Sequence, residues 1–145
     1  MSNEDNKGLY RRWLLGMWNG DADEAAAIAS EIAAPHLVVH QARAGRDESK
    51  TPRGPDALVQ IVTQGRAPFD EVKVSIEVGP VAEGDLVSAR WEFAGSYNGG
   101  IPGATAAAGT LVAFAGIDLF RIENGKLAEY WVSSDDGYLM AQLGM

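Results

Sequence analysis

The spacing of apolar residues changes once along this chain, and that change limits the folds that it can adopt. Up to about residue 66, apolar positions recur every three to four residues, which is the spacing of amphipathic helices. After Asp70 they alternate with polar residues, as they do in strands that bury one face. Helices followed by consecutive strands predict an α+β domain in which helices cover one face of a curved, mostly antiparallel sheet.

Three helices are expected in the first half of the chain, over residues 4–18, 21–33 and 54–65. Asp21 and Glu24 have the spacing of a capping box at the start of the second helix. Pro35 cannot continue that helix, and Pro55 stands at the first position of the third, where no hydrogen bond is lost. A short strand at residues 37–41 and a loop over residues 42–53 are predicted between the second and third helices.

Four more strands are expected, over residues 72–78, 86–97, 111–122 and 127–133. The Asn124-Gly125 pair predicts a two-residue hairpin turn between the last two strands, because both residues tolerate a positive φ. With that turn, Asp118 lies opposite Trp131, and Phe120 lies opposite Glu129. Directly opposed residues share a face of the sheet, so these four side chains are expected to form one patch.

A carboxylate among aromatic side chains is a candidate acid or base. If Asp118 lies in an apolar pocket wall, loss of hydration raises its pKa and suits it to proton transfer. The alternative is an exposed Asp118, or one that is paired with an arginine as a structural ion pair. His40 ends a short apolar strand, where it is either a proton shuttle or hydrogen-bond donor to a ligand carbonyl, or a structural histidine. Trp91 and Trp131 lie on strands, where an indole lines a ligand cavity or belongs to the core.

Composition excludes several classes of protein. At 145 residues the chain has the size of one domain, and no cysteine is present for a disulfide, a thiolate zinc site or a thiol nucleophile. The net charge of −8 disfavours nucleic acid as a partner. We find no spacing typical of a metal site, no glycine-rich nucleotide motif, no membrane-spanning run and no signal peptide. The expectation is a cytoplasmic protein without cofactor or metal that does not bind a membrane.

Several segments resemble a known family. Residues 54–58, 67–74, 90–91 and 95–102 are similar to parts of the SnoaL-like proteins, and so above all are residues 116–131, GIDLFRIENGKLAEYW. Val39-His40 resembles the early histidine of the family, and residues 139–144 fit its short C-terminal segment. SnoaL-like proteins are polyketide cyclase-like members of the nuclear transport factor 2-like, or ketosteroid isomerase-like, superfamily.

The resemblance implies a single domain over residues 1–145, folded as a cone-shaped α+β barrel with about three N-terminal helices on a curved sheet. It implies a cavity between the helices and the sheet, a homodimer formed through the sheet, and cofactor-independent acid/base chemistry. On this interpretation the ligand is an apolar carbonyl compound, Asp118 is the base and His40 binds the developing enolate. The residues expected to contact the ligand are Trp131, Trp91, Phe120, Tyr97 and Glu129.

The chain departs from the family pattern at one position. Many relatives carry Asp or Asn directly after the Trp of the last strand, where an acid or base is proposed, but Val132 stands there in this chain. Asp118, or Asp135 further along, would have to replace it. The alternative hypothesis is a non-catalytic protein that binds a small molecule in the same cavity.

Overall fold

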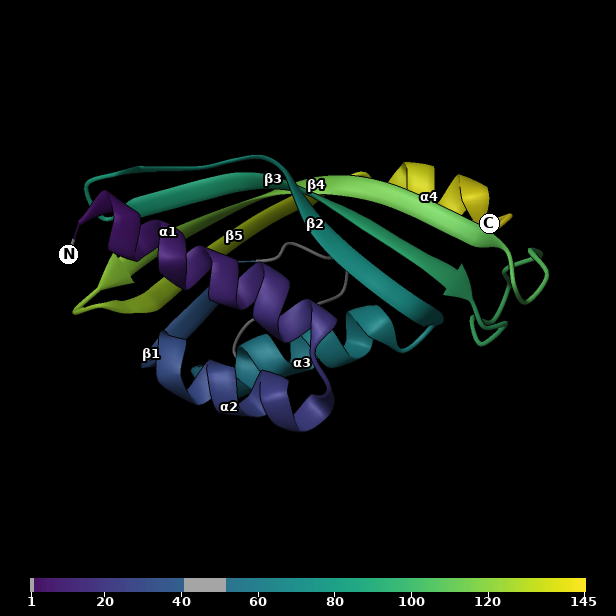
Figure 1. The fold of residues 1–145 in the computed structure, drawn as a ribbon. Coiled ribbons are helices and arrows are strands. Elements are labelled where there is room, and N and C mark those ends of the chain that lie inside the picture. Colours follow the sequence, from purple (N-terminus) through teal and green to yellow (C-terminus); the bar gives the residue numbers. More distant parts are fainter. Residues whose placement is uncertain (1, 41–51) are drawn as a thin grey trace.

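The computed structural model of the chain describes residues 2–40 and 52–145 and confirms the α+β architecture. Helices α1 (Asn3–Arg11), α2 (Ala22–Ile32) and α3 (Pro55–Arg66) lie on one side of a five-stranded sheet, and α4 (Asp136–Gln142) follows the last strand (Figure 1). Within the described residues no helix is long and apolar enough to cross a membrane. Most of the loop predicted over residues 42–53 lies outside the described residues, as does residue 41 of the predicted short strand.

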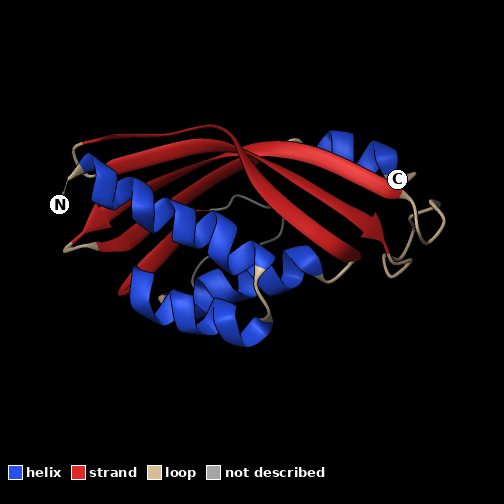
Figure 2. Ribbon diagram, viewed as in Figure 1, coloured by secondary structure: helices blue, strands red, loops and turns tan. Residues whose placement is uncertain are grey.

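The sheet has the strand order β1-β5-β4-β3-β2. Only β1 and β5 pair in parallel, and every other neighbouring pair is antiparallel. Figure 2 shows the curvature of the strands and the three N-terminal helices against the concave, inner face. The strands are β1 (Ala33–His40), β2 (Phe69–Glu83), β3 (Leu86–Tyr97), β4 (Leu111–Glu123) and β5 (Lys126–Ser134).

The first helix is not the single α-helix that its apolar stripe predicts. After α1 the chain continues as a π-helical segment, η1 (Arg12–Met17). π-Helical turns are rare and occur frequently at functional sites. Tyr10, Trp13 and Met17 are fully buried against the inner face of the sheet. The first helix therefore supplies a row of large side chains to the space beneath the sheet.

Helix α3 passes close to the ring of Trp18, and this predicts a large difference between two glycine substitutions. A Cβ added at Gly65 would lie 2.5 Å from Cη2 of Trp18, so Gly65→Ala should lower the free energy of unfolding by about 1–3 kcal/mol. Gly8 lies within α1 with no atom near such a Cβ, so Gly8→Ala should raise it by about 0.5–1 kcal/mol. Urea denaturation measures both, and equal stability of the two variants would contradict the close packing.

Candidate functional site

The hairpin between β4 and β5 determines which residues share the inner face of the sheet. Its turn is the predicted one, with φ of 51° at Asn124 and 75° at Gly125. The first two pairs beyond the turn, Glu123 with Lys126 and Ile122 with Leu127, also follow the predicted register. A β-bulge comes next, because the ladder skips Ala128 before pairing resumes. The predicted register therefore holds only next to the turn.

Beyond the bulge the predicted pairs are wrong by one residue. Asp118 pairs with Val132 instead of Trp131, and Phe120 pairs with Tyr130 instead of Glu129. Since neighbouring residues of a strand point to opposite faces, this shift exchanges the two faces of β5. The aromatic side chain from β5 that joins Asp118 beneath the sheet is thus Tyr130.

The bulge has a physical reason in the residues after the turn. Leu127 and Ala128 are both fully buried, although consecutive residues of a regular strand cannot face the same side. Two consecutive apolar residues at that point were the available sign of a bulge. A regular two-residue hairpin leaves one of them on the outer face.

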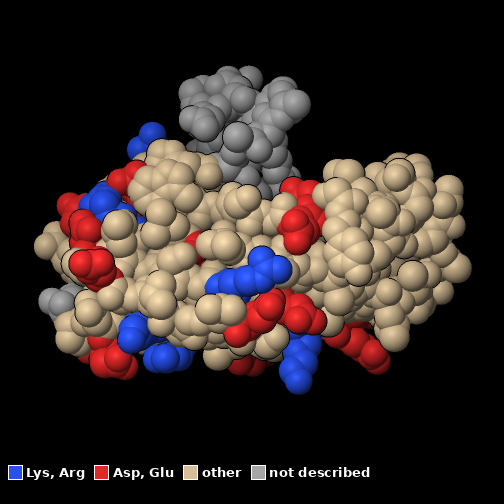
Figure 3. Space-filling view, turned by 90° about the horizontal axis from the view of Figure 1, so that it is seen from above, with Lys and Arg blue, Asp and Glu red and all other residues tan. Residues whose placement is uncertain are grey.

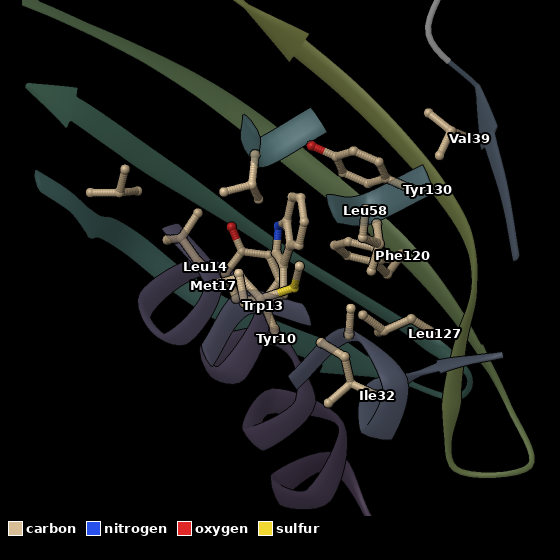
Figure 4. Packing of buried hydrophobic residues seen from close by; sticks show 14 of the residues in the cluster. Tyr10, Trp13, Leu14, Met17, Ile32, Val39, Leu58, Phe120, Leu127 and Tyr130 are labelled. Carbon is tan, nitrogen blue, oxygen red and sulfur yellow. The ribbon is translucent and has the colours of Figure 1, made fainter. Parts of the chain in front are cut away.

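Asp118 is buried and its carboxylate accepts three hydrogen bonds. The side chain is 1 % exposed. The Tyr10 hydroxyl and the Trp13 indole N–H donate to Oδ2 at 3.0 and 3.1 Å, and the Tyr130 hydroxyl donates to Oδ1 at 2.6 Å. Figure 4 shows these three donors beneath the sheet, two from the first helix and one from β5. Both oxygens of the carboxylate thus have partners.

The surroundings change the acidity of the carboxyl and of both tyrosines. Burial raises the pKa of Asp118 above its ordinary value, against the opposing effect of the hydrogen bonds from Tyr130, Trp13 and Tyr10. Burial and the neighbouring carboxylate raise the pKa of both tyrosines, so that both hydroxyls stay protonated at neutral pH. Asp118 is therefore the group of this cluster that can gain or lose a proton.

The raised pKa of Asp118 predicts a pH-dependent stability. The folded protein binds this proton more tightly than the unfolded chain, so the stabilisation from Asp118 is complete below the ordinary aspartic acid pKa of about 3.8 and is lost as the pH rises through the raised pKa. The free energy of unfolding of wild type, compared with that of Asp118→Asn, should fall with increasing pH over this interval. Urea denaturation at a series of pH values measures this difference, and a constant difference would contradict the shift.

A cavity opens between α3 and the inner face of the sheet. Its volume is about 270 Å³, and a smaller chamber of about 60 Å³ lies next to it and reaches Asp118. The larger cavity is walled mainly by apolar side chains, among them Trp18, Ile61, Phe69, Trp91, Ile101, Phe114 and Leu139. Both spaces are lined by Trp18, Gly65, Trp91, Phe114 and Tyr130.

Polar groups lie at two places in this cavity. Gln60, Gln64 and Asp136 line it on exposed parts of the chain, and Tyr130 lines it beside Asp118. No lysine or arginine is among the described residues that line either space. An apolar cavity with a few convergent polar groups is typical of small-molecule sites.

The residues predicted to act with Asp118 are divided between the two faces of the sheet. Trp91, one of the expected ligand contacts, lines both the cavity and the chamber. Phe120 and Tyr97 also face inward but lie in the core: Phe120 stacks on Tyr130 at 4.5 Å, and the Tyr97 hydroxyl donates to the carbonyl of Ile101.

His40, Glu129 and Trp131 lie together on the outer face, away from Asp118. The His40 ring stacks on Trp131 at 5.0 Å, and its Nε2 lies 2.8 Å from Oε2 of Glu129. Arg121 donates to Oε1 of the same carboxylate at 2.6 Å and is the first cause of its lowered pKa. Figure 3 shows the charged side chains that gather over part of this face. The structure thus does not bring His40 to the carboxylate it was expected to assist.

Three residues of the site were not predicted from the sequence. Tyr10 and Trp13 lie in the predicted first helix but were not among the expected ligand contacts, and the predicted register puts Tyr130 on the face of the sheet opposite to Asp118. A usable sign was the spacing of Tyr10 and Trp13, which are three apart and so share a helix face. The partner of these polar tips could not be identified without the register of β5.

Comparison with known proteins identifies the family. The family model described as SnoaL-like polyketide cyclase matches residues 9–143. The chain belongs to the SnoaL-like polyketide cyclase family. No curated protein sequence matches significantly.

Several solved structures share the fold of this chain. TsrD from Streptomyces laurentii has 23% identity and a TM-score of 0.79, with 99% of this chain and 98% of that chain covered. IdmH, a proposed polyketide cyclase from Streptomyces antibioticus, has 24% identity and a TM-score of 0.72, with 98% and 97% covered. AclR, a proposed hydroxylase from Streptomyces galilaeus, has 19% identity and a TM-score of 0.75, with 99% and 98% covered.

In this SnoaL-like chain Val132, at the position where the chain departs from the family pattern, lies beside Asp118. Val132 lines the cavity, and Asp118 is its partner on the neighbouring strand. Paired residues of adjacent strands share a face and have Cβ atoms about 4.5–5.5 Å apart. A carboxylate is thus present on the same wall, one strand away from position 132, where the resemblance to the family implies Asp or Asn.

Proposed function

We propose that this protein is an enzyme that performs cofactor-independent acid/base chemistry on an apolar carbonyl compound. The reaction is of the polyketide cyclase (aldol) type, or a related isomerisation or hydrolysis, and Asp118 is the base. The observation that carries the proposal is a buried carboxylate with three hydrogen-bond donors at the inner end of an apolar cavity. A carboxyl whose pKa is raised by burial is closer to the pH at which general acids and bases work best.

The proposed chemistry needs one proton acceptor. Asp118 receives a proton from a carbon beside a carbonyl group, and an enolate forms. The enolate carbon attacks a second carbonyl carbon of the same molecule, so that a carbon–carbon bond forms and the attacked oxygen becomes an alkoxide. That oxygen takes the proton back, and Asp118 returns to its ionised form. Apolar walls favour this sequence because they keep water from the enolate.

We expect an uncharged, largely apolar substrate, because the described lining residues offer aromatic and aliphatic contacts and no cation. We also expect a homodimer in the cytoplasm. Support for the dimer comes from Ile117 and Leu111 on the outer face of β4, which are 48 % and 79 % exposed. Analytical ultracentrifugation at micromolar concentration tests it, and a species of 15.4 kDa alone would contradict it.

Deuterium exchange of a model ketone tests the proposed activity. The uncharged bicyclic ketone 2-tetralone has acidic hydrogens at C1, and NMR in D₂O measures their replacement with and without the protein. Faster exchange in the presence of protein, saturating with 2-tetralone, is the expected result. Binding is followed separately with 2-naphthol, which should quench the fluorescence of Trp18 and Trp91 in the cavity wall.

The same pair of measurements addresses the alternative of a non-catalytic binding protein, which the valine at position 132 favours. Quenching by 2-naphthol together with an exchange rate equal to that in buffer would favour the binding protein and contradict the enzyme. Exchange that 2-naphthol inhibits competitively would support the enzyme and place the reaction in the cavity.

A further inference from the structure

Tyr130 differs from the other two donors to Asp118 in its position. Its hydroxyl lies 2.6 Å from Oδ1, and its side chain lines both the large cavity and the inner chamber. Tyr10 and Trp13 donate to Oδ2 and line neither space. Tyr130 is therefore the one donor of the three that a ligand in the cavity can touch.

The carboxylate itself is poorly placed to meet a ligand of more than one ring. Asp118 is 1 % exposed, and both of its oxygens already accept hydrogen bonds. The chamber that reaches it has a volume of about 60 Å³, enough for a few water molecules. A fused-ring ligand occupies the larger cavity of about 270 Å³, where Tyr130 forms part of the wall.

We propose that the Tyr130 hydroxyl is the group that contacts the reacting atoms of the substrate, and that Asp118 exchanges protons with the substrate through it. This proposal rests on the proposed function, in which Asp118 is the base. Tyr130 is then the catalytic residue in contact with substrate, and Asp118, Tyr10 and Trp13 set its proton and its orientation. The 2.6 Å separation of Oη and Oδ1 is a distance at which a proton passes between them.

The relay balances in both directions. In the first step Oη of Tyr130 takes the proton from the substrate carbon while its own proton passes to Oδ1 of Asp118, which leaves an enolate, a neutral tyrosine and a neutral carboxyl. After the carbon–carbon bond forms, Tyr130 gives a proton to the alkoxide and regains one from Asp118. The cycle ends with an ionised Asp118 and a protonated Tyr130, as it began.

The surroundings of Tyr130 suit this role. Its ring stacks on Phe120 at 4.5 Å and meets the edge of Trp13 at 5.4 Å, so that its orientation is restricted. Deprotonation of the phenol is disfavoured by burial and by the neighbouring carboxylate, so it enters the cycle as a neutral donor. A relay needs a hydroxyl that gives one proton while it takes another.

The matched variants Tyr130→Phe and Tyr10→Phe test the relay, since each removes one hydroxyl from Asp118 and only the first faces the cavity. Exchange at C1 of 2-tetralone should fall about 10²-fold in Tyr130→Phe. In Tyr10→Phe it should fall less than about tenfold, because this variant leaves the proton path from the cavity through Tyr130 in place. Circular dichroism and 2-naphthol binding check that both variants are folded and keep the cavity.

A second measurement does not depend on turnover. In protein that carries ¹³C-labelled tyrosine, NMR should show a nuclear Overhauser effect between the ring of Tyr130 and the C1 hydrogens of bound 2-tetralone, because the relay places the Tyr130 hydroxyl against that carbon. The effect should be absent in Tyr130→Phe and kept in Tyr10→Phe. Equal losses of rate in the two variants, or the lack of this nuclear Overhauser effect in wild type, would overturn the relay. If Asp118→Asn loses exchange while Tyr130→Phe keeps it, the relay fails and the proposed function stands. Full exchange in Asp118→Asn contradicts the proposed function itself.

Discussion

Replacing Asp118 by Asn is expected to slow exchange at C1 of 2-tetralone by about 10²–10⁴-fold, the usual contribution of a general base. Asparagine keeps the size of the side chain, and its carbonyl oxygen still accepts a hydrogen bond. It cannot take up a proton at neutral pH, so the proton that leaves the substrate carbon has no acceptor and the enolate does not form. Binding of 2-naphthol should survive, because the aromatic walls of the cavity are unchanged.

Asp135→Asn is the matched control for this loss. Asp135 is the other carboxylate that could replace the acid missing at position 132, but its side chain is exposed at the start of α4. Its replacement should leave the exchange rate within about twofold of wild type, because Asp135 is exposed and is not among the described residues that line the cavity. A large loss of exchange in Asp135→Asn, with full activity in Asp118→Asn, would mean that Asp135 is the base and Asp118 is not.

Trp13→Ala is expected to lower the free energy of unfolding by about 3–5 kcal/mol, the usual effect of truncating a buried aromatic residue. Trp13 is fully buried and meets Phe120 and Tyr130 edge to face, with ring centroids 5.7 and 5.4 Å apart. The variant also deprives the buried carboxylate of Asp118 of its indole donor, which adds to the loss.

Trp131→Ala provides the comparison, since it removes the same side chain from the outer face, where Trp131 is only partly buried against His40. Its cost should be clearly smaller, and its effect on 2-naphthol binding should be absent. Chemical denaturation of both variants at one pH measures the difference. Equal destabilisation would mean that the outer face is packed as tightly as the space beneath the sheet.

The order of helices and strands could be predicted from the sequence because burial imposes a different spacing on each. The position of Asp118 within a strand could be predicted in the same way, and the structure shows that its side chain shares the inner face of β4 with Val112, Phe120 and Ile122. These inferences need only one element at a time. They hold wherever the local pattern is regular.

The partners of Asp118 required information that alternation does not contain. A bulge adds one residue to one strand and changes the pairing of everything beyond it, so the prediction was correct at Leu127 and wrong at Glu129. β1 pairs in parallel with β5, and His40 is the partner of Trp131 in this pairing. His40 therefore lies on the outer face together with Trp131. The bulge between β4 and β5 accounts for the correction at Trp131, and the pairing of β1 with β5 places His40 beside it.

The pairing of Asp118 with Val132 has a consequence for how functional groups are traced through divergent families. An aligned column records the place of a residue along the chain, whereas a substrate meets only the place of a side chain in the cavity. An acidic side chain can therefore occur at either of two paired positions on adjacent strands, and its place in the cavity then differs by about one strand spacing only. A search for active family members that requires an acidic residue at the position of Val132 would omit this chain. A search that accepts an acidic residue at either of the two facing positions, 118 or 132, would include it.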